Sequence, residues 1–423
     1  MRQRVHQQLF FICSFALAFF LPVFPKILPI IIVVMTINWL FSGIYLKTVP
    51  RLFVEKWRLH TISFISFYLL YLVGMLYSTD YSYGWFDLEV KLSLLIFPII
   101  FATSDLSVYN ESRIRLILGS FIGGCITGSL ILLGHTWLFN ARWGVPDTYY
   151  YSNLSWYFHT SYLAMYFTFG VGIMLYYLSV DPFKQSFPKI LLLSLLILYL
   201  EIFIFLFSSK AGLIMLALTQ VLFVILLLYK KIGLTKVTYI FLIMATVFIG
   251  FSRIFPFAFK RIAKADTMVT SSQNIQSNPN DGTIARMEIW KISAGLIRQN
   301  FFFGVGTGDV KDVLMEAYRD HQLYPVYKKK LNAHNQYIQT FITIGVVGFS
   351  LLVATLFIPA IRSLRRGEYL YFIFVLIFAG NILFESMFET QAGVIFYAFF
   401  NAFAFSNSAF SFEQSGRQDG KDF

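Results

Sequence analysis

Long apolar runs separated by short polar loops make up most of this 423-residue chain. An α-helix needs roughly 20 apolar residues, within a range of about 17–25, to cross the hydrocarbon core of a bilayer. The fourth run is short and a proline-containing stretch joins the first two, so the pattern predicts about twelve spanning helices, to within one. The runs lie near residues 8–24, 27–44, 60–77, 89–103, 114–138, 159–179, 189–207, 211–229, 237–254, 336–360, 369–385 and 390–407.

The charges in the short loops favour the same topology. Basic residues gather in alternate loops, and the positive-inside rule predicts that these loops are cytoplasmic, as are both termini. They are Lys47, Arg51, Lys56, Arg58, Arg113, Arg115, Lys184, Lys189, Lys230, Lys231, Lys236, Arg362, Arg365 and Arg366. The net charge of +12 is thereby explained by topology, so we expect no nucleic-acid partner. Hydrophobic residues make up 57% of the chain, above the roughly 45–50% of soluble domains, so we expect membrane lipid around it.

One long loop, residues 255–335, interrupts this pattern late in the chain and is predicted to face away from the cytoplasm. It begins with a polar linker, continues from Thr283 with apolar residues at helical spacing, and has a second helical segment at about 309–320. The chain therefore divides into spanning helices one to nine (1–254), the large loop (255–335), and spanning helices ten to twelve with a cytoplasmic tail (336–423).

Between the two predicted loop helices lies the glycine-rich run GVGTGD, residues 304–309. A glycine-rich turn before a helix can present backbone N–H groups to a phosphate. However, this run does not follow a strand and lacks the Lys-Ser/Thr pair of a P-loop. We therefore favour a helix-to-helix turn that needs glycine geometry.

The acidic residues of the large loop do not indicate a metal. Asp309, Asp312 and Glu316 share one helix face, but acidic residues in a first helical turn need no metal, and no histidine joins them at ligand spacing. Cys13 and Cys125 both lie in apolar runs, so a disulfide or a cysteine metal site is not expected. The sequence predicts chemistry without a metal or another cofactor.

Three stretches resemble the O-antigen ligase and polymerase superfamily of bacterial envelope glycosyltransferases. They are FSSKAGLIMLAL (207–218), ARMEIWKISAGLIRQNFFFGVGTGD (285–309) and AHNQYIQTFITIGVVGF (333–349). The resemblance implies an all-α polytopic protein, similar to the GT-C class of multi-pass glycosyltransferases, in the bacterial inner membrane. It also implies transfer of a glycan from undecaprenyl diphosphate to an acceptor hydroxyl, such as that of lipid A core, on the periplasmic face.

The resemblance implies roles for three residues. Arg286 matches the family's loop arginine and would hold the diphosphate. The diphosphate is the leaving group, and its negative charge needs neutralisation by cations. Lys210 lies where the family usually carries arginine, so it would neutralise phosphate charge without the bidentate hydrogen bonds of a guanidinium. His334 matches the family's catalytic histidine and would remove the acceptor proton. The alternatives are a surface arginine, a snorkelling lysine and a structural histidine.

Further residues are expected near the donor. His159 and Tyr162 resemble a recurrent His-x-x-Tyr feature of relatives, Asn335 adjoins His334, and Arg261 lies at the entrance of the large loop. An interfacial aromatic belt would explain Tyr162 equally well, and a solvated basic cluster would explain Arg261. Glu385 and Glu389 are interpreted as ordinary loop charges.

Four functions remain open on the sequence. Within the superfamily the chain could be a ligase, which we favour, a polysaccharide polymerase or a protein O-oligosaccharyltransferase. A polysaccharide or lipid transporter is the alternative from another class, and it predicts ionisable residues buried in the membrane. Glu201, inside the seventh run, is the main residue of that kind.

Overall fold

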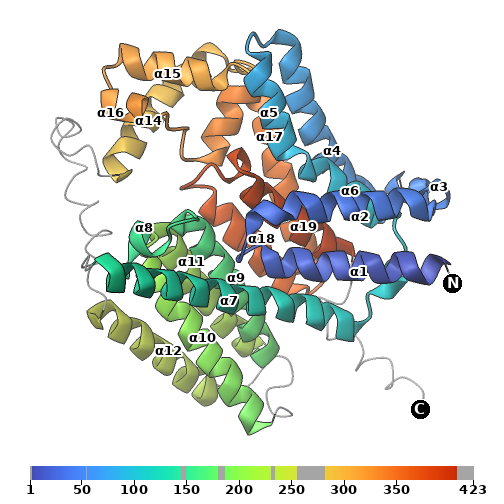
Figure 1. Cartoon of the computed structure of the whole chain (residues 1–423), viewed down its shortest axis with the longest axis vertical. Coiled ribbons are helices and arrows are strands. Elements are labelled where there is room, and N and C mark those ends of the chain that lie inside the picture. Colours follow the sequence, from blue (N-terminus) through green and yellow to red (C-terminus); the bar gives the residue numbers. More distant parts are fainter. Residues whose placement is uncertain are drawn as a thin grey trace.

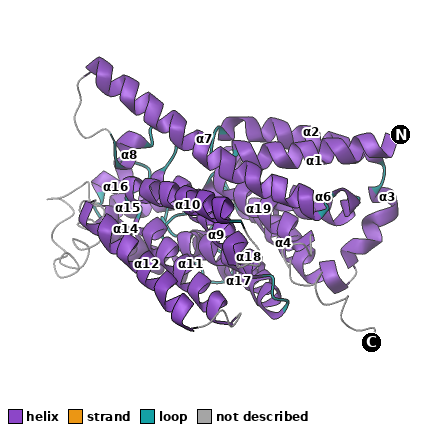
Figure 2. Cartoon of the chain, turned by 90° about the horizontal axis from the view of Figure 1, so that it is seen from below, coloured by secondary structure: helices purple, strands orange, loops and turns teal. Residues whose placement is uncertain are grey.

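The computed structural model describes residues 2–53, 55–143, 149–179, 186–229, 234–254 and 282–406, and all regular structure in these ranges is helical (Figure 2). Seven helices there are long and apolar enough to cross a membrane, which fits a polytopic membrane protein. They are Pro25–Ser42, Leu59–Tyr77, Glu111–Arg142, Thr160–Ser179, Phe187–Phe207, Lys210–Leu228 and Gln336–Arg365.

Other expected spans are shorter or interrupted. The run at 89–103 is divided at Leu92 between α5 (Tyr81–Lys91) and α6 (Ser93–Thr103), and the last two runs form the shorter helices α18 (Tyr369–Asn381) and α19 (Gln391–Ser406). Twelve spans therefore stay a prediction. The remaining longer helices are α1 (Arg2–Phe20), α2 (Leu28–Ser42), α4 (Glu55–Gly74), α7 (Glu111–Trp143), α9 (Thr160–Ser179), α10 (Phe187–Phe207), α11 (Lys210–Tyr229), α12 (Leu234–Ile254), α14 (Gly282–Gln299), α15 (Val310–Asp320) and α17 (Gln336–Arg365).

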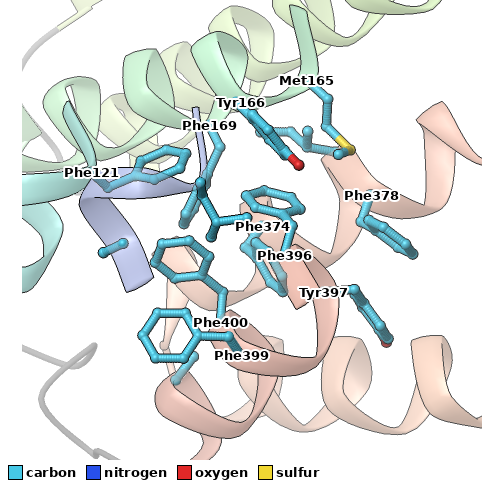
Figure 3. Packing of buried hydrophobic residues seen from close by; sticks show 14 of the residues in the cluster. Phe121, Met165, Tyr166, Phe169, Phe374, Phe378, Phe396, Tyr397, Phe399 and Phe400 are labelled. Carbon is cyan, nitrogen blue, oxygen red and sulfur yellow. The ribbon is translucent and has the colours of Figure 1, made fainter. Parts of the chain in front are cut away.

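Helix α9 is the centre of the bundle, because nearly all of its residues are buried and it packs against α7, α10, α11 and α18. Phenylalanine rings fill the space between these helices and α19 (Figure 3). The ring centroids of Phe169 and Phe374 are 5.1 Å apart, and those of Phe121 and Phe400 are 5.0 Å apart. Lipid tails are as apolar as these rings, so close packing rather than exclusion from water holds the helices together.

The predicted helices of the large loop are confirmed. Helix α14 begins at Gly282, one residue before the predicted start, and α15 begins at Val310. With the short helix α16 (Tyr324–Lys328) they form a cap, residues 282–335, which has a small apolar core of its own. The cap lies at the same end of the molecule as α5 and one end of α17 (Figure 1). The preceding residues 255–281 lie outside the described part of the chain.

The glycine-rich turn between α14 and α15 inserts into a break in α17. The break is at Ile344 and Gly345, and Gly345 has a φ of +66°. Val305 and Gly306 donate their N–H groups to the carbonyls of Ile342 and Thr343, at 2.8 and 2.9 Å. A Cβ atom at Gly345 would come within 2.1 Å of a carbonyl oxygen of the cap. Glycine is required here because both the backbone conformation and the close approach exclude a side chain.

The other amide groups of this turn are also used within the protein. Thr307 donates its N–H to Gly74 O at 3.4 Å, and Gly308 donates its N–H to Ser78 Oγ at 2.9 Å. These groups point at protein oxygens rather than at an empty cradle. The interpretation as a helix-to-helix turn is confirmed, and the phosphate cradle is not supported.

Candidate active site

Glu385 joins two of the three residues that the resemblance singled out. Its Oε1 accepts a hydrogen bond from Arg286 Nη2 at 2.5 Å, and its Oε2 lies 3.0 Å from His334 Nδ1. The three side chains come from the N-terminal part of α14, the loop before α17 and the loop after α18. Segments that are far apart in the sequence therefore meet in one network of charged and polar groups.

The Glu385 carboxyl is almost fully buried, and it is held ionised by its two partners. Burial opposes ionisation, but the hydrogen bond and charge of His334 and the charge of Arg286 lower the pKa of Glu385 to about 2. An ionised carboxylate only accepts hydrogen bonds, so Nδ1 of His334 must donate. In the neutral imidazole, Nε2 then carries the lone pair and can accept a proton.

The backbone at His334 is strained and is held by several hydrogen bonds. Its φ of +47° lies in the left-handed region, which costs a non-glycine residue roughly 1–2 kcal/mol. The carbonyl of Ala333 accepts from Trp290 Nε1 at 3.0 Å, and the His334 N–H is donated to Asn332 Oδ1 at 3.0 Å. Such strain persists only where the surroundings determine the conformation, and it is enriched at functional sites.

Arg286 has further capacity to bind an anion. Its guanidinium is only partly exposed, and its Nε is buried without a hydrogen-bond partner among the described residues. An unpaired buried donor of a charged group is costly, so this atom is suited to an acceptor oxygen from outside. Arg286 is the fifth residue of α14 and lies next to its first turn, where the helix dipole favours negative charge.

Lys210, the first residue of α11, reaches the same helical turn. Its Nζ donates to Thr283 Oγ1 at 2.5 Å, and Thr283 precedes Arg286 by three residues on α14. The structure therefore brings two cations, from a spanning helix and from the cap, to the N-terminal turn of α14. An arrangement of this kind can neutralise a diphosphate between them.

His159 lies close enough to this network to interact with it electrostatically. Burial lowers the pKa of His159, the Glu385 carboxylate opposes the shift, and the charges of His334 and Arg286 add to it. Tyr162 is buried, and its hydroxyl accepts a hydrogen bond from Thr390 Oγ1 at 3.0 Å. Donor binding by these two residues stays a prediction.

The two other residues expected at the substrate differ in their outcome. Asn335 is the N-cap of α17: its side chain accepts the Ile338 N–H at 3.1 Å, and its own N–H is donated to Ser386 Oγ. Its visible contacts hold the loop that carries His334, and contact with substrate stays a prediction. Arg261 lies outside the described residues.

The sequence interpretation of the two glutamates as ordinary loop charges is not supported, because Glu385 is buried, Glu389 is partly buried, and both are paired. Glu389 lies 3.2 Å from Lys91 Nζ, which also pairs with Asp87 at 2.5 Å. Gln336, the first residue of α17, joins this second cluster to the loop, since its Oε1 accepts the Phe388 N–H at 2.7 Å. A pair of acids four residues apart in an otherwise apolar stretch was the only signal in the sequence.

No group of three or more His, Cys, Asp or Glu side chains that could hold a metal occurs within the described ranges. Asp309 is occupied in another way: its carboxylate accepts hydrogen bonds from the Thr79 N–H at 2.7 Å and the Asp80 N–H at 2.8 Å. It thus fastens the start of α15 to the segment before α5.

A cavity of about 470 Å³ lies away from this network, between α1, α2 and the start of the loop after α6. Its lining includes Gln7, Trp39 and Asp105. None of the residues that the sequence marked for chemistry lines it. We place the candidate active site at the Arg286–Glu385–His334 network because the chemistry of the side chains, rather than open volume, defines it.

Comparison with known protein families identifies the region that carries these residues. Residues 191–353 match the family model described as O-antigen ligase. This match supports the O-antigen ligase superfamily for this chain. No curated protein matches the chain. The matched region includes Lys210, Arg286 and His334, whereas His159 and Glu385 lie outside it.

The O-antigen ligase family, to which this region is similar, implies a glycosyltransferase-like enzyme in general terms. It likewise implies a lipid-linked glycan donor and an acceptor. The resemblance that the three sequence stretches indicated is therefore confirmed at the level of the superfamily. The identity of the donor and the acceptor, and the membrane face on which they meet, belong to the proposal below.

Proposed function

We propose that the chain is a metal-independent, inverting glycosyltransferase that moves a glycan from undecaprenyl diphosphate to an acceptor hydroxyl, with lipid A core as the favoured acceptor. The reaction would take place on the periplasmic face of the bacterial inner membrane, with both termini in the cytoplasm. The observation that carries the proposal is the Glu385 bridge between Arg286 and His334. It links a cation suited to a diphosphate with an imidazole suited to a base.

The proposed reaction is a single in-line displacement. Nε2 of His334 takes the proton of the acceptor hydroxyl as the acceptor oxygen attacks the anomeric carbon of the donor. The bond between that carbon and the diphosphate oxygen breaks, and its electron pair stays on the diphosphate. Attack from the side opposite to the leaving group inverts the anomeric carbon. The proton remains on His334 until it passes to water.

The leaving group explains why the network contains cations rather than a general acid. A lipid diphosphate is stable as an anion and needs charge neutralisation more than protonation. Arg286 would bind its oxygens through the unpaired donor Nε, and Lys210 would act as a point charge. The Glu385 carboxylate keeps the His334 base oriented, and the diphosphate of the donor supplies the anionic oxygens that the cations bind.

The polymerase and the protein O-oligosaccharyltransferase would share this chemistry and differ only in the acceptor. The transporter alternative has one observation in its favour, the buried Glu201 of α10, whose Oε1 accepts from Gln220 Nε2 at 2.7 Å. The Glu201 carboxyl is therefore hydrogen-bonded within the bundle, and among the described residues no second ionisable side chain is paired with it there. We therefore favour the enzyme.

The test is glycan transfer by purified protein from undecaprenyl-diphosphate-glycan, with lipid A core, free donor and peptide offered as separate acceptors. His334→Asn is the sharpest variant, because asparagine tolerates the left-handed backbone at this position but cannot act as a base. We expect transfer to one acceptor, its loss in His334→Asn, and unchanged thermal unfolding and donor binding in that variant.

Two further arms separate the alternatives. Activity that survives millimolar EDTA would support metal independence, whereas its loss, with recovery on adding a divalent cation, would contradict it. Folded wild-type protein that binds donor but transfers to no acceptor would favour the transporter, as would movement of the lipid-linked glycan across vesicle membranes.

A further inference from the structure

An exposed aromatic surface lies at the far end of α14 from Arg286. The turn after α14 presents three consecutive phenylalanines, Phe301, Phe302 and Phe303, and the last two are 67% and 70% exposed. Beside them lies Tyr77, which is also exposed and whose hydroxyl contacts the backbone of Phe303. Contiguous exposed apolar patches of this kind mark surfaces that meet another apolar phase.

The rings project from a turn whose backbone is firmly held. Phe303 O accepts a hydrogen bond from Tyr77 Oη at 2.6 Å, and Phe301 O accepts the Val346 N–H at 2.9 Å. Gly304 donates its N–H to Asn300 O at 3.0 Å. These three backbone groups of the turn are therefore satisfied within the protein, which lowers the cost of placing the segment in a bilayer.

The surface is continuous with two spanning helices. On one side it meets the end of the Leu59–Tyr77 span, whose Leu72 and Leu76 are exposed as lipid-facing residues would be. On the other side the Phe301 ring packs 5.4 Å from the ring of Phe341, in the first turns of the α17 span. The turn thus lies between the ends of two helices that are long and apolar enough to cross a membrane.

We propose that the Phe301–Phe303 turn is a membrane anchor, inserted at the boundary between headgroups and acyl chains of the leaflet on the cap side. The partner is the phospholipid bilayer, since aromatic rings are favoured at this level of the membrane. The cap is then attached to the lipid at one end and reaches the Arg286 network at the other.

This attachment has a consequence for α14. The helix has 18 residues and is about 27 Å long. Its C-terminal end is held by the anchor, and its N-terminal turn lies beside Glu385 and Lys210 at the ends of other helices. Helix α14 therefore runs across the end of the bundle, along the membrane surface. This inference does not depend on the reaction proposed above.

The test measures the depth of a spin label in vesicles of phosphatidylethanolamine and phosphatidylglycerol. Phe302→Cys and Phe303→Cys replace exposed side chains, so folding is not threatened, and the buried Cys13 and Cys125 of the parent chain set the labelling background. Arg319→Cys, on the exposed face of α15, is the aqueous control, and Leu72→Cys is the lipid-facing control. Collisions with oxygen report lipid, and collisions with a water-soluble nickel complex report water.

We expect the labels at 302 and 303 to resemble the label at Leu72, with a ratio of oxygen to nickel collisions several-fold above that at Arg319. A ratio equal to that at Arg319 would overturn the anchor, because the turn would then lie in water. Protection from both reagents would also overturn it and would indicate a protein partner on this surface. Because the measurement needs no glycan transfer, failure of the proposed function would leave its outcome unchanged.

Discussion

Replacing Glu385 by glutamine tests the centre of the proposed site with the smallest change in shape. The amide keeps the volume of the carboxyl but has one oxygen in place of two, so it keeps only one of the two acceptor positions that serve Arg286 Nη2 and His334 Nδ1. It also presents an N–H donor to whichever partner loses its acceptor. The substitution therefore removes a charge-assisted hydrogen bond and permits the wrong tautomer of His334.

The magnitude follows from the hydrogen bond to the imidazole. A hydrogen bond to a charged group contributes about 1.5–3 kcal/mol, which corresponds to a rate loss of roughly 10–150-fold if it is realised in the transition state. A forced change of tautomer would increase the loss, since an acid-to-amide change in a catalytic triad lowers kcat by about 10⁴. Donor binding should be equal or tighter, because Arg286 is released from its carboxylate.

The assay is single-turnover transfer at saturating donor, with donor binding measured separately. Glu288→Gln is the matched control. It also replaces a glutamate by glutamine, but Glu288 lies on α14 in a more exposed ion pair with Lys291. We expect its rate to equal that of the wild type. A wild-type rate in Glu385→Gln, or a loss confined to donor affinity with kcat unchanged, would refute the assignment of Glu385 as the residue that orients the base.

Three other predictions concern stability. Lys91→Met leaves the carboxylates of Asp87 and Glu389 without their cation and should lower the free energy of unfolding by about 3–5 kcal/mol. Adding Glu389→Gln to this variant should restore part of the lost stability, as measured by thermal unfolding. Gly345→Ala should lower the free energy of unfolding by at least ~2 kcal/mol, because Gly345 has a φ of +66° and a carbonyl oxygen would lie 2.1 Å from the added Cβ atom. The control is Gly295→Ala, at an open position within a helix, which should raise the free energy of unfolding by about 0.5–1 kcal/mol. The pKa of Glu385 falls from 4.5 to about 2 on folding, so ionised Glu385 should contribute roughly 3 kcal/mol to the free energy of unfolding. This contribution should be complete above pH 4.5 and disappear as the pH falls towards 2. A difference in the free energy of unfolding between wild type and Glu385→Gln that does not change across this range would contradict the prediction.

Much of the helical fold could be predicted from the sequence, because helix formation in a membrane depends on local apolar length. The predicted spans at 159–179 and 189–207 agree with α9 and α10 within two residues. The amphipathic period likewise located α14 and α15. The prediction of one helix at 89–103 was less accurate, because the chain divides there between two helices at Leu92. Apolar length does not reveal this division or the burial of Lys91 against acidic partners.

The candidate site was only half visible in the sequence. Motif resemblance singled out Arg286 and His334, because each lies in a recognisable local pattern. Glu385 lies in no such pattern, and its charge resembled that of any loop acid. Its importance comes from partners 99 and 51 residues away, which only packing brings within hydrogen-bond distance.

The sequence by itself thus determined that this is a helical membrane protein, where its cap begins, and which cation and which imidazole to examine. The tertiary structure decided which groups those residues meet, which tautomer His334 adopts, and that the glycine-rich turn fills a break in α17 instead of binding phosphate. The physical reason is that hydrophobic length and periodicity act along the chain. Hydrogen bonds, ion pairs and backbone strain depend on distances across it, and these exist only once the helices have packed.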